Sequence, residues 1–240
     1  MTPQEKRDEI IALANDLNGS LVKESREGLL RQGGNLLLGC YYAQSPIIYF
    51  SPNPGSWGCE MDFVPAFDGR SGPNPLFDSS DEYVRGRQGG YGRKWRQFLA
   101  DNPGLYHWFN DRVTSTFLCP WRTPDGRDLD NLDRDTDHRL FDYSGQLVRK
   151  IIEHHTPRLL IMAGIKSLHC LNETLRVWNL AEINRAVVGP EPQCRKLVID
   201  RMDITVLQIP HFSYRFLSSL HFEILAGWLR MELREIGLKN

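Results

Sequence analysis

The sequence predicts an α/β fold in three layers (α/β/α), with helices covering both faces of a central, mainly parallel four-stranded sheet. Short apolar runs typical of buried strands alternate with longer segments whose apolar residues recur at helical spacing. With 240 residues, 41% of them hydrophobic, the chain can bury one full core. We therefore expect residues 1–240 to form a single domain.

The amino-terminal half opens with a helix signal. Thr2-Pro3-Gln4-Glu5 has the spacing of a capping box, with proline at the first helical position. The elements expected after it are a helix ending near Asn18-Gly19, an amphipathic stretch over Leu21 to Leu30, a strand over Pro46 to Phe50, a long glycine-, proline- and polar-rich loop or insertion at about 68–94, a short helix over Trp95 to Leu99, and a strand over Val113 to Cys119.

The carboxyl-terminal half continues the alternation. The expected elements are a solvated, salt-bridged loop from Asp125 to Asp142, a helix capped by Ser144 and ended near Thr156-Pro157, a buried strand over Leu159 to Ala163, a helix over Leu168 to Trp178, a short strand over Leu197 to Asp200, a strand over Ile204 to Ile209, and a last helix from Leu217 that stops at Gly237. His154 and His155, at a helix carboxyl terminus, are interpreted as surface residues that complement the helix dipole.

Composition narrows the function classes. The chain contains neither an apolar run near the roughly 18 residues of a membrane span nor a secretion signal. Its five cysteines are scattered without a Cys-x-x-Cys pair, which favours reduced core thiols in a cytoplasmic protein over a metal centre. A net charge of −1 gives no global attraction to nucleic acid, so such binding would need a local basic patch. We expect a monomer without cofactor or metal.

Two loops carry groups suited to chemistry. The strand ending at Phe50 runs into Ser51-Pro52-Asn53-Pro54-Gly55, a stiff turn in which Asn53 supplies both an amide donor and an acceptor. The strand ending at Ile209 runs into Pro210-His211-Phe212-Ser213. Because α/β sheets hold ligands at the carboxyl ends of their strands, we expect this amide and this imidazole to face each other across a cleft.

This pairing of loops resembles the uracil-DNA glycosylase superfamily. Asn53-Pro54-Gly55 is similar to the first motif of its mismatch-specific branch, Pro210-His211-Phe212-Ser213 to the start of its second motif, and Pro157 to Gly164 to its third strand. The resemblance covers Pro46 to about Tyr214. It implies a monofunctional enzyme that hydrolyses the bond between deoxyribose and a damaged or modified pyrimidine flipped out of DNA, leaving an abasic site.

The chemistry of base release agrees with these residue types. Breaking the bond builds positive charge on the sugar and negative charge on the departing base. Asn53 can orient the attacking water, and His211 can donate a hydrogen bond to the base oxygen, a role that the family implies. An amide in place of a carboxylate stabilises the sugar cation less. Such a site should depend on bases that leave readily or are easily unpaired.

Other residues are candidates for holding the base and the DNA. Phe67 is the favoured candidate to stack on the flipped base, and Phe63 and Trp57 are the other candidates. Packing in the protein core is the alternative interpretation of each of these rings. Main-chain groups near Pro54 and Gly55, and the hydroxyl of Ser115, are candidate substrate contacts. DNA contacts are expected from a basic stretch interleaved with glycines, which can also be a solvated surface loop: Arg85, Arg87, Arg93, Lys94 and Arg96. Further contacts are expected from the second loop, which can also cap the last helix: Phe212, Ser213, Tyr214, Arg215 and Phe216.

The preferred base stays open between uracil, mismatched thymine and a hypermodified cytosine. Val113 to Thr116 offers only hydroxyls where uracil-reading relatives often carry an asparagine, and the long loop at 68–94 suits a wider pocket. Some superfamily members excise bulky cytosines from phage DNA in antiviral defence, and this chain is interpreted as a possible member of that kind. Two alternatives remain: a non-catalytic nucleic-acid-binding protein with the same fold, and a metal-dependent nuclease that uses the aspartates between Asp128 and Asp137.

Overall fold

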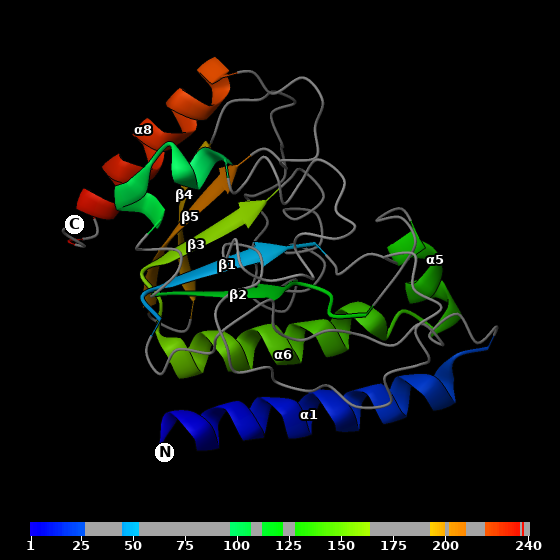
Figure 1. Cartoon of the computed structure of the whole chain (residues 1–240). Helices are drawn as coiled ribbons and strands as arrows, with labels where there is room; N and C mark the ends of the chain where they lie inside the picture. Colours follow the sequence, from blue (N-terminus) through cyan, green and yellow to red (C-terminus); the bar gives the residue numbers. More distant parts are fainter. Residues whose placement is uncertain are drawn as a thin grey trace.

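The computed structural model describes nine segments of the chain, and these contain the sheet and the helices that cover it (Figure 1). They are residues 1–26, 45–52, 97–106, 112–121, 128–163, 193–199, 202–209, 219–235 and 237. The expected long loop at 68–94, the expected helix over Leu168 to Trp178 and residues 27–30 of the expected stretch over Leu21 to Leu30 lie outside the described residues. The start of that stretch, up to Glu24, belongs to the first helix.

The sheet contains four parallel strands and one antiparallel edge strand. Its order is β2-β1-β3-β5-β4, where the strands are β1 (Ile47–Ser51), β2 (Val113–Phe117), β3 (Leu159–Ala163), β4 (Gln193–Ile199) and β5 (Met202–Ile209). β2, β1, β3 and β5 are mutually parallel, and β4 pairs antiparallel with β5. The predicted mainly parallel sheet is confirmed. The short strand expected over Leu197 to Asp200 is instead the end of the longer β4.

Side chains of the parallel strands alternate between two cores. On β1, Ile48 and Phe50 join the core beneath α1 (Pro3–Glu24) and α6 (Leu140–His155), whereas Ile47 and Tyr49 join the core beneath α8 (Ser219–Glu235). β3 and β5 divide their side chains in the same way. Because both faces are covered, the central strands β1 and β3 are apolar along nearly their whole length rather than at alternate positions.

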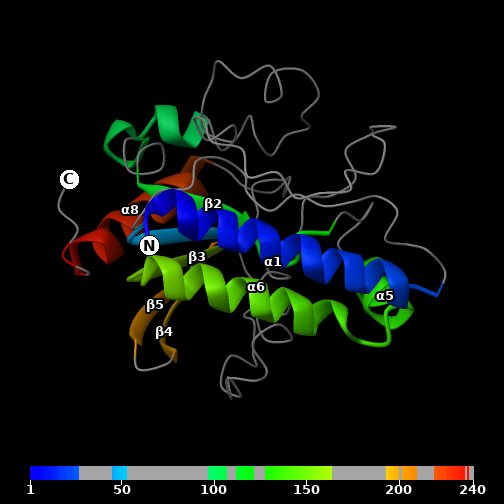
Figure 2. The ribbon, with the colours of Figure 1, turned by 90° about the horizontal axis from the view of Figure 1, so that it is seen from below.

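The helices form the two outer layers. α1 and α6 lie side by side on one face, and α8 lies on the other with the helical turns at 97–100 and 103–106 (Figures 1 and 2). The connections β1–β2 and β2–β3 run in opposite directions along the sheet, so right-handed crossovers place them on opposite faces. The three-layer prediction is therefore confirmed. None of the described helices has both the length and the apolar character that a membrane crossing requires.

Two helix boundaries differ from expectation because polar side chains are used inside the fold. α1 continues past Asn18-Gly19 to Glu24. The Asn18 carboxamide is 4% exposed and its oxygen accepts from Nε1 of the buried Trp121 at 3.0 Å, so this asparagine is a core residue rather than a helix end. α6 begins at Leu140 instead of Ser144, and the Ser144 hydroxyl donates to the Leu140 carbonyl at 2.8 Å within the first turns.

One buried hydroxyl joins the amino ends of β1 and β2. Ser45 Oγ accepts from the backbone N–H of Thr114 at 2.8 Å and lies within hydrogen-bond distance of the carbonyls of Ile47 (2.7 Å) and Arg112. The side chain is fully buried, so no water can replace these contacts at the protein surface. Ser45 therefore holds two neighbouring strands in register at the edge opposite to their carboxyl ends.

We expect Ser45→Ala to lower the free energy of unfolding by about 1–3 kcal/mol, because the buried Thr114 N–H loses its acceptor. Ser20→Ala is the matched control. The Ser20 hydroxyl only donates to a carbonyl one turn earlier on α1, and its loss should change stability by no more than about 0.5 kcal/mol. Urea unfolding followed by far-UV circular dichroism measures both, and equal effects would contradict the role of Ser45.

Candidate active site at the carboxyl edge of the sheet

The carboxyl ends of the four parallel strands meet at one edge of the sheet. β1 and β3 are neighbours at its centre, and the chain leaves β1 toward β2 on one side before returning through α6 to β3 on the other. This is a topological switch point, where open α/β sheets place their ligands. The first predicted motif begins at the end of β1, so it starts at this position.

The backbone beyond β1 is held to the segment beyond β2. Leu118 N–H donates to the Ser51 carbonyl and Cys119 N–H donates to the Pro52 carbonyl, both at 2.9 Å. These two bonds extend the parallel pairing past the ends of both strands. Pro52, the residue that precedes Asn53, is thereby fixed relative to the sheet.

The second predicted motif follows β5, two strands away from β1. Ala163 of β3 pairs with Ile209 of β5, and continuing the β1–β3 register by one residue sets Ser51 level with Ala163. Ser51, Ala163 and Ile209 therefore form one row across three neighbouring strands. Two strand spacings separate Ser51 from Ile209, a distance of about 10 Å. Asn53 and His211 each come two residues after that row in the sequence.

Most predicted site residues lie outside the described part of the chain. These are the two catalytic candidates, the substrate-binding candidates after β1, the basic stretch and the second loop: Asn53, His211, Pro54, Gly55, Trp57, Phe63, Phe67, Arg85, Arg87, Arg93, Lys94, Arg96, Phe212, Ser213, Tyr214, Arg215 and Phe216. The structure brings together the strand ends from which the two catalytic motifs depart, and the roles of the side chains stay predictions.

Ser115 is the one predicted substrate contact that the structure describes. It lies in the middle of β2, paired with Tyr49, and is fully buried. By strand alternation its side chain points to the same face as Val113, the face covered by α8. Ser115 therefore lies on the same face as Phe117, the last residue of β2, and two residues before it. Its contact with a substrate stays a prediction.

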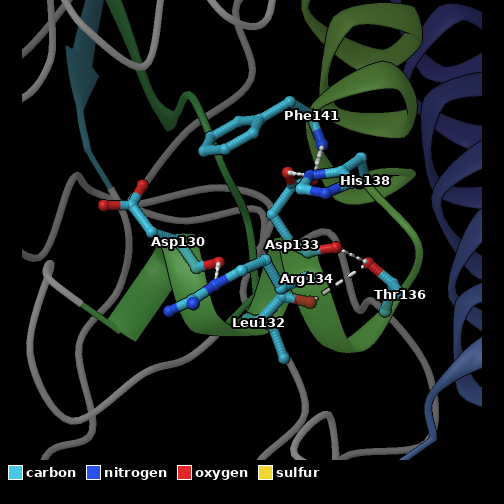
Figure 3. A network of polar contacts seen from close by, with 7 residues as sticks. All are labelled: Asp130, Leu132, Asp133, Arg134, Thr136, His138 and Phe141. Atoms are coloured by element: carbon cyan, nitrogen blue, oxygen red, sulfur yellow. Dashed lines mark hydrogen bonds and ion pairs between the residues drawn. The ribbon is translucent and has the colours of Figure 1, made fainter.

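The aspartate-rich stretch is helical where the structure describes it, so the expectation of a solvated loop is wrong there. α5 covers Asp128–Asp135, and Asp133 is only 6% exposed. Its Oδ2 lies 2.8 Å from Nδ1 of His138, and its Oδ1 accepts from the Phe141 N–H at 3.3 Å (Figure 3). Arg139 at the amino terminus of α6 makes no side-chain cap, so Asp133 supplies that cap from the preceding helix.

The same turn is tied to the end of α1. Ser25 donates its hydroxyl hydrogen to Asp135, Arg26 forms an ion pair with Asp137, and Arg26 N–H donates to the Asp135 carbonyl at 3.2 Å. Within the described ranges, no three His, Cys, Asp or Glu side chains are grouped in a way that could hold a metal ion. Asp133, Asp135 and Asp137 thus serve the helix junction.

His154 and His155 are buried, so their interpretation as surface residues is wrong. Nδ1 of His155 accepts from the Ser45 N–H at 3.1 Å, and burial lowers the pKa of this imidazole to about 3. His154 Nε2 lies 3.0 Å from Oε2 of Glu9, whose other carboxylate oxygen, Oε1, pairs with Lys150. Burial lowers the pKa of His154 as well. These histidines join α6 to α1 and to the start of β1.

Cys119 is a free, fully buried thiol, in agreement with the expected reduced core thiols, and its backbone N–H donates to the Pro52 carbonyl. Burial raises the pKa of the Cys119 thiol to about 12, against a usual value of 9.0. A thiol that keeps its proton to such a high pH is a poor nucleophile at neutral pH. Cys119 therefore contributes packing and backbone geometry at the candidate site.

The edge row itself was not predicted from the sequence. It consists of Phe117, Ser51, Ala163 and Ile209, whose side chains share the α8 face by strand alternation. Ser51 and Ala163 occupy its two central positions at the switch point. The only signal in the sequence is a small residue at the end of each central strand, and recognising it requires the register.

Comparisons with known proteins do not add to this picture. No model of a protein family matches the chain, and no curated protein matches it.

We expect the free energy of unfolding to fall as the pH drops from 6.5 toward 3, because His155 binds its proton more weakly in the folded than in the unfolded chain. One such proton contributes a slope of about 1.4 kcal/mol per pH unit in this window. His155→Asn keeps an acceptor for the Ser45 N–H but cannot bind the proton, so its profile should be flatter by that slope. Denaturant unfolding between pH 4 and 7.5 measures both proteins, and parallel profiles would contradict the assignment.

Asp133→Ala should lower the free energy of unfolding by about 1–3 kcal/mol, because α6 loses its cap and His138 its partner. Asp130→Ala is the matched control on the same helix. Asp130 is exposed, and its removal should cost no more than about 0.5 kcal/mol. Thermal and urea unfolding compare the two. Equal stability of both variants would show that Asp133 is not the cap.

Proposed function

We propose that the protein is a DNA glycosylase that hydrolyses the bond between deoxyribose and a damaged or modified pyrimidine. The observation that supports this most is the row shared by Ser51 and Ile209, from which the two motif-bearing loops depart on either side of β3. Chain connectivity keeps Asn53 and His211 within two residues of that row. The pairing of motifs resembles the uracil-DNA glycosylase superfamily, and the observed fold has the sheet that such a site needs.

The proposed reaction needs no covalent enzyme intermediate. As the bond between C1′ and the base nitrogen breaks, its electron pair leaves with the base and the sugar becomes an oxocarbenium-like cation. Asn53 holds a water whose oxygen adds to C1′, and the proton released from that water ends on the departing base. His211 donates a hydrogen bond to the base oxygen, where negative charge accumulates.

The remaining predicted contacts serve base flipping and DNA binding. Phe67, with Phe63 as a second candidate, would stack on the extruded base, and Pro54, Gly55 and Ser115 would contact the base or sugar. The basic stretch from Arg85 to Arg96 would bind phosphates. We infer a cytoplasmic monomer that acts on DNA without a cofactor.

The substrate class that we favour is a bulky, hypermodified cytosine, as in the excision of modified bases from phage DNA. The described part of β2 carries Thr114, Ser115 and Thr116, so no side-chain amide is available there to read the edge of uracil. Hydroxyl groups distinguish one base from another less sharply than a side-chain amide does, because the same hydroxyl oxygen can both donate and accept a hydrogen bond. Efficient excision of uracil combined with no action on glucosylated hydroxymethylcytosine would contradict this choice.

We expect purified protein to create abasic sites, without strand breaks, in duplexes that contain a single modified pyrimidine, and to do so in EDTA. The panel contains uracil, mismatched thymine and glucosylated hydroxymethylcytosine, and alkali-labile cleavage is the readout. Asn53→Ala and His211→Ala should each lower the single-turnover rate by about 100- to 1,000-fold, because each removes a group that acts on developing charge or on the water.

Asn131→Ala, at an exposed position of α5, is the matched amide control and should keep the wild-type rate. Unfolding curves check that every variant is folded. DNA binding without product would favour a nucleic-acid-binding protein, and strand breaks that require Mg²⁺ would favour a nuclease. Either result would contradict the proposal, as would wild-type rates in both loop variants.

A further inference from the structure

A pocket of about 380 Å³ lies between α8 and the segment that contains the helical turns at 97–100 and 103–106, which sits beside α8 on the same face of the sheet (Figure 1). This volume is within the usual range of small-molecule sites. None of the described lining residues belongs to a strand or to either loop that is proposed to act on DNA. The pocket is therefore separate from the candidate active site.

The floor of the pocket is apolar and mainly aromatic. Phe98 is buried and packs against Phe222 of α8, with the ring centroids 6.0 Å apart and the ring planes tilted by 45°. Ala226, one turn further along α8, is also buried and lines the pocket with a single methyl group. Two aromatic rings beside a short side chain suit a flat apolar group, and aromatic rings also attract a nearby cation.

The rim of the pocket is charged, and its guanidinium group is bonded to a neutral amide. Arg230 donates to Oδ1 of Asn102. Asp101 and Glu223 are exposed on the same rim, and the Asp101 carboxylate accepts from a side-chain amide one turn earlier at 2.9 Å. Neither carboxylate forms an ion pair with any residue that the structure describes. The described rim thus carries two unpaired negative charges against one positive charge.

We propose that this pocket binds an organic ammonium ion that carries a flat apolar group. The apolar group would lie on the pair formed by Phe98 and Phe222, and the ammonium group would donate to Asp101 and Glu223 at the rim. Because Arg230 is bonded to an amide, the ligand does not have to break an existing ion pair in order to reach a carboxylate. This site is independent of the proposed glycosylase function, since the two share no described residue.

Four small probes separate the contribution of the charge from that of the ring. Phenethylammonium carries both groups, phenethyl alcohol keeps the ring without the charge, ethylammonium keeps the charge without the ring, and hydrocinnamate reverses the charge. Titration of the full chain, followed by two-dimensional NMR, should give phenethylammonium a dissociation constant of about 0.1–10 mM, as expected for a ligand of this size. The side-chain amide signals of Asn102 should shift. The other three probes should bind at least about fivefold more weakly.

Two variants remove the rim charges and keep the shape of the side chains. Asp101→Asn and Glu223→Gln should each weaken phenethylammonium binding about two- to fivefold, as expected for exposed charge pairs. In the double variant Arg230 is the only charge left on the described rim, so hydrocinnamate should bind more tightly than it does to wild type. Glu235→Gln is the matched control, because it removes an exposed charge from the last turn of α8, outside the described lining of the pocket.

The comparison of probes on wild type needs no variant, and unfolding curves check that each variant is folded. Tighter binding of phenethylammonium than of the other probes, lost stepwise with the two carboxylates and unchanged in Glu235→Gln, would support the site. Equal binding of phenethylammonium and phenethyl alcohol would overturn it, as would no binding of either. Equal weakening by Glu223→Gln and Glu235→Gln would also overturn it, because the effect would then come from the net charge of the protein and not from the pocket.

Discussion

The backbone ladder that joins β1 to β3 and β3 to β5 is the constraint on which the rest of the structure depends. Parallel pairing puts the carboxyl ends of these strands at one edge, and the register sets Ser51, Ala163 and Ile209 level with one another. A slip of one residue in either pairing would turn every side chain of the strand to the opposite face. The relative position of the two strand ends from which the motif-bearing loops depart is therefore a property of the sheet.

Polar residues in the described segments mainly secure this sheet and the helices around it. Ser45 and His155 fasten the amino ends of the strands, and Asp133 caps α6 from the preceding helix. Each of these side chains is buried and hydrogen-bonded to neighbours in the fold. In a sequence they have the same appearance as catalytic histidines or metal-binding aspartates, so burial and bonding decide between the two interpretations.

Much of the fold was predictable from local patterns. The alternation of apolar strands and helices predicted the layers and most strand positions, and the run from Leu159 to Ala163 is β3 as observed. The errors arose where a tertiary contact overrides a local signal. Asn18 lies inside a helix because its carboxamide oxygen accepts a hydrogen bond from Trp121 in the core. His154 and His155 are buried because α1 and Ser45 pack against them. The edge row with Ser51 and Ala163 depends on pairing between distant strands, which no local pattern contains.

The central claim is that one carboxamide and one imidazole, which follow different strands, act on the same nucleotide. A double-mutant cycle tests this most directly, with single-turnover rates of wild type, Asn53→Ala, His211→Ala and the double variant on one duplex. Groups that act together on one transition state are strongly non-additive. We predict that the double variant is only slightly slower than the slower single variant. A loss equal to the product of the two single losses would show that the residues act independently and would contradict a shared site.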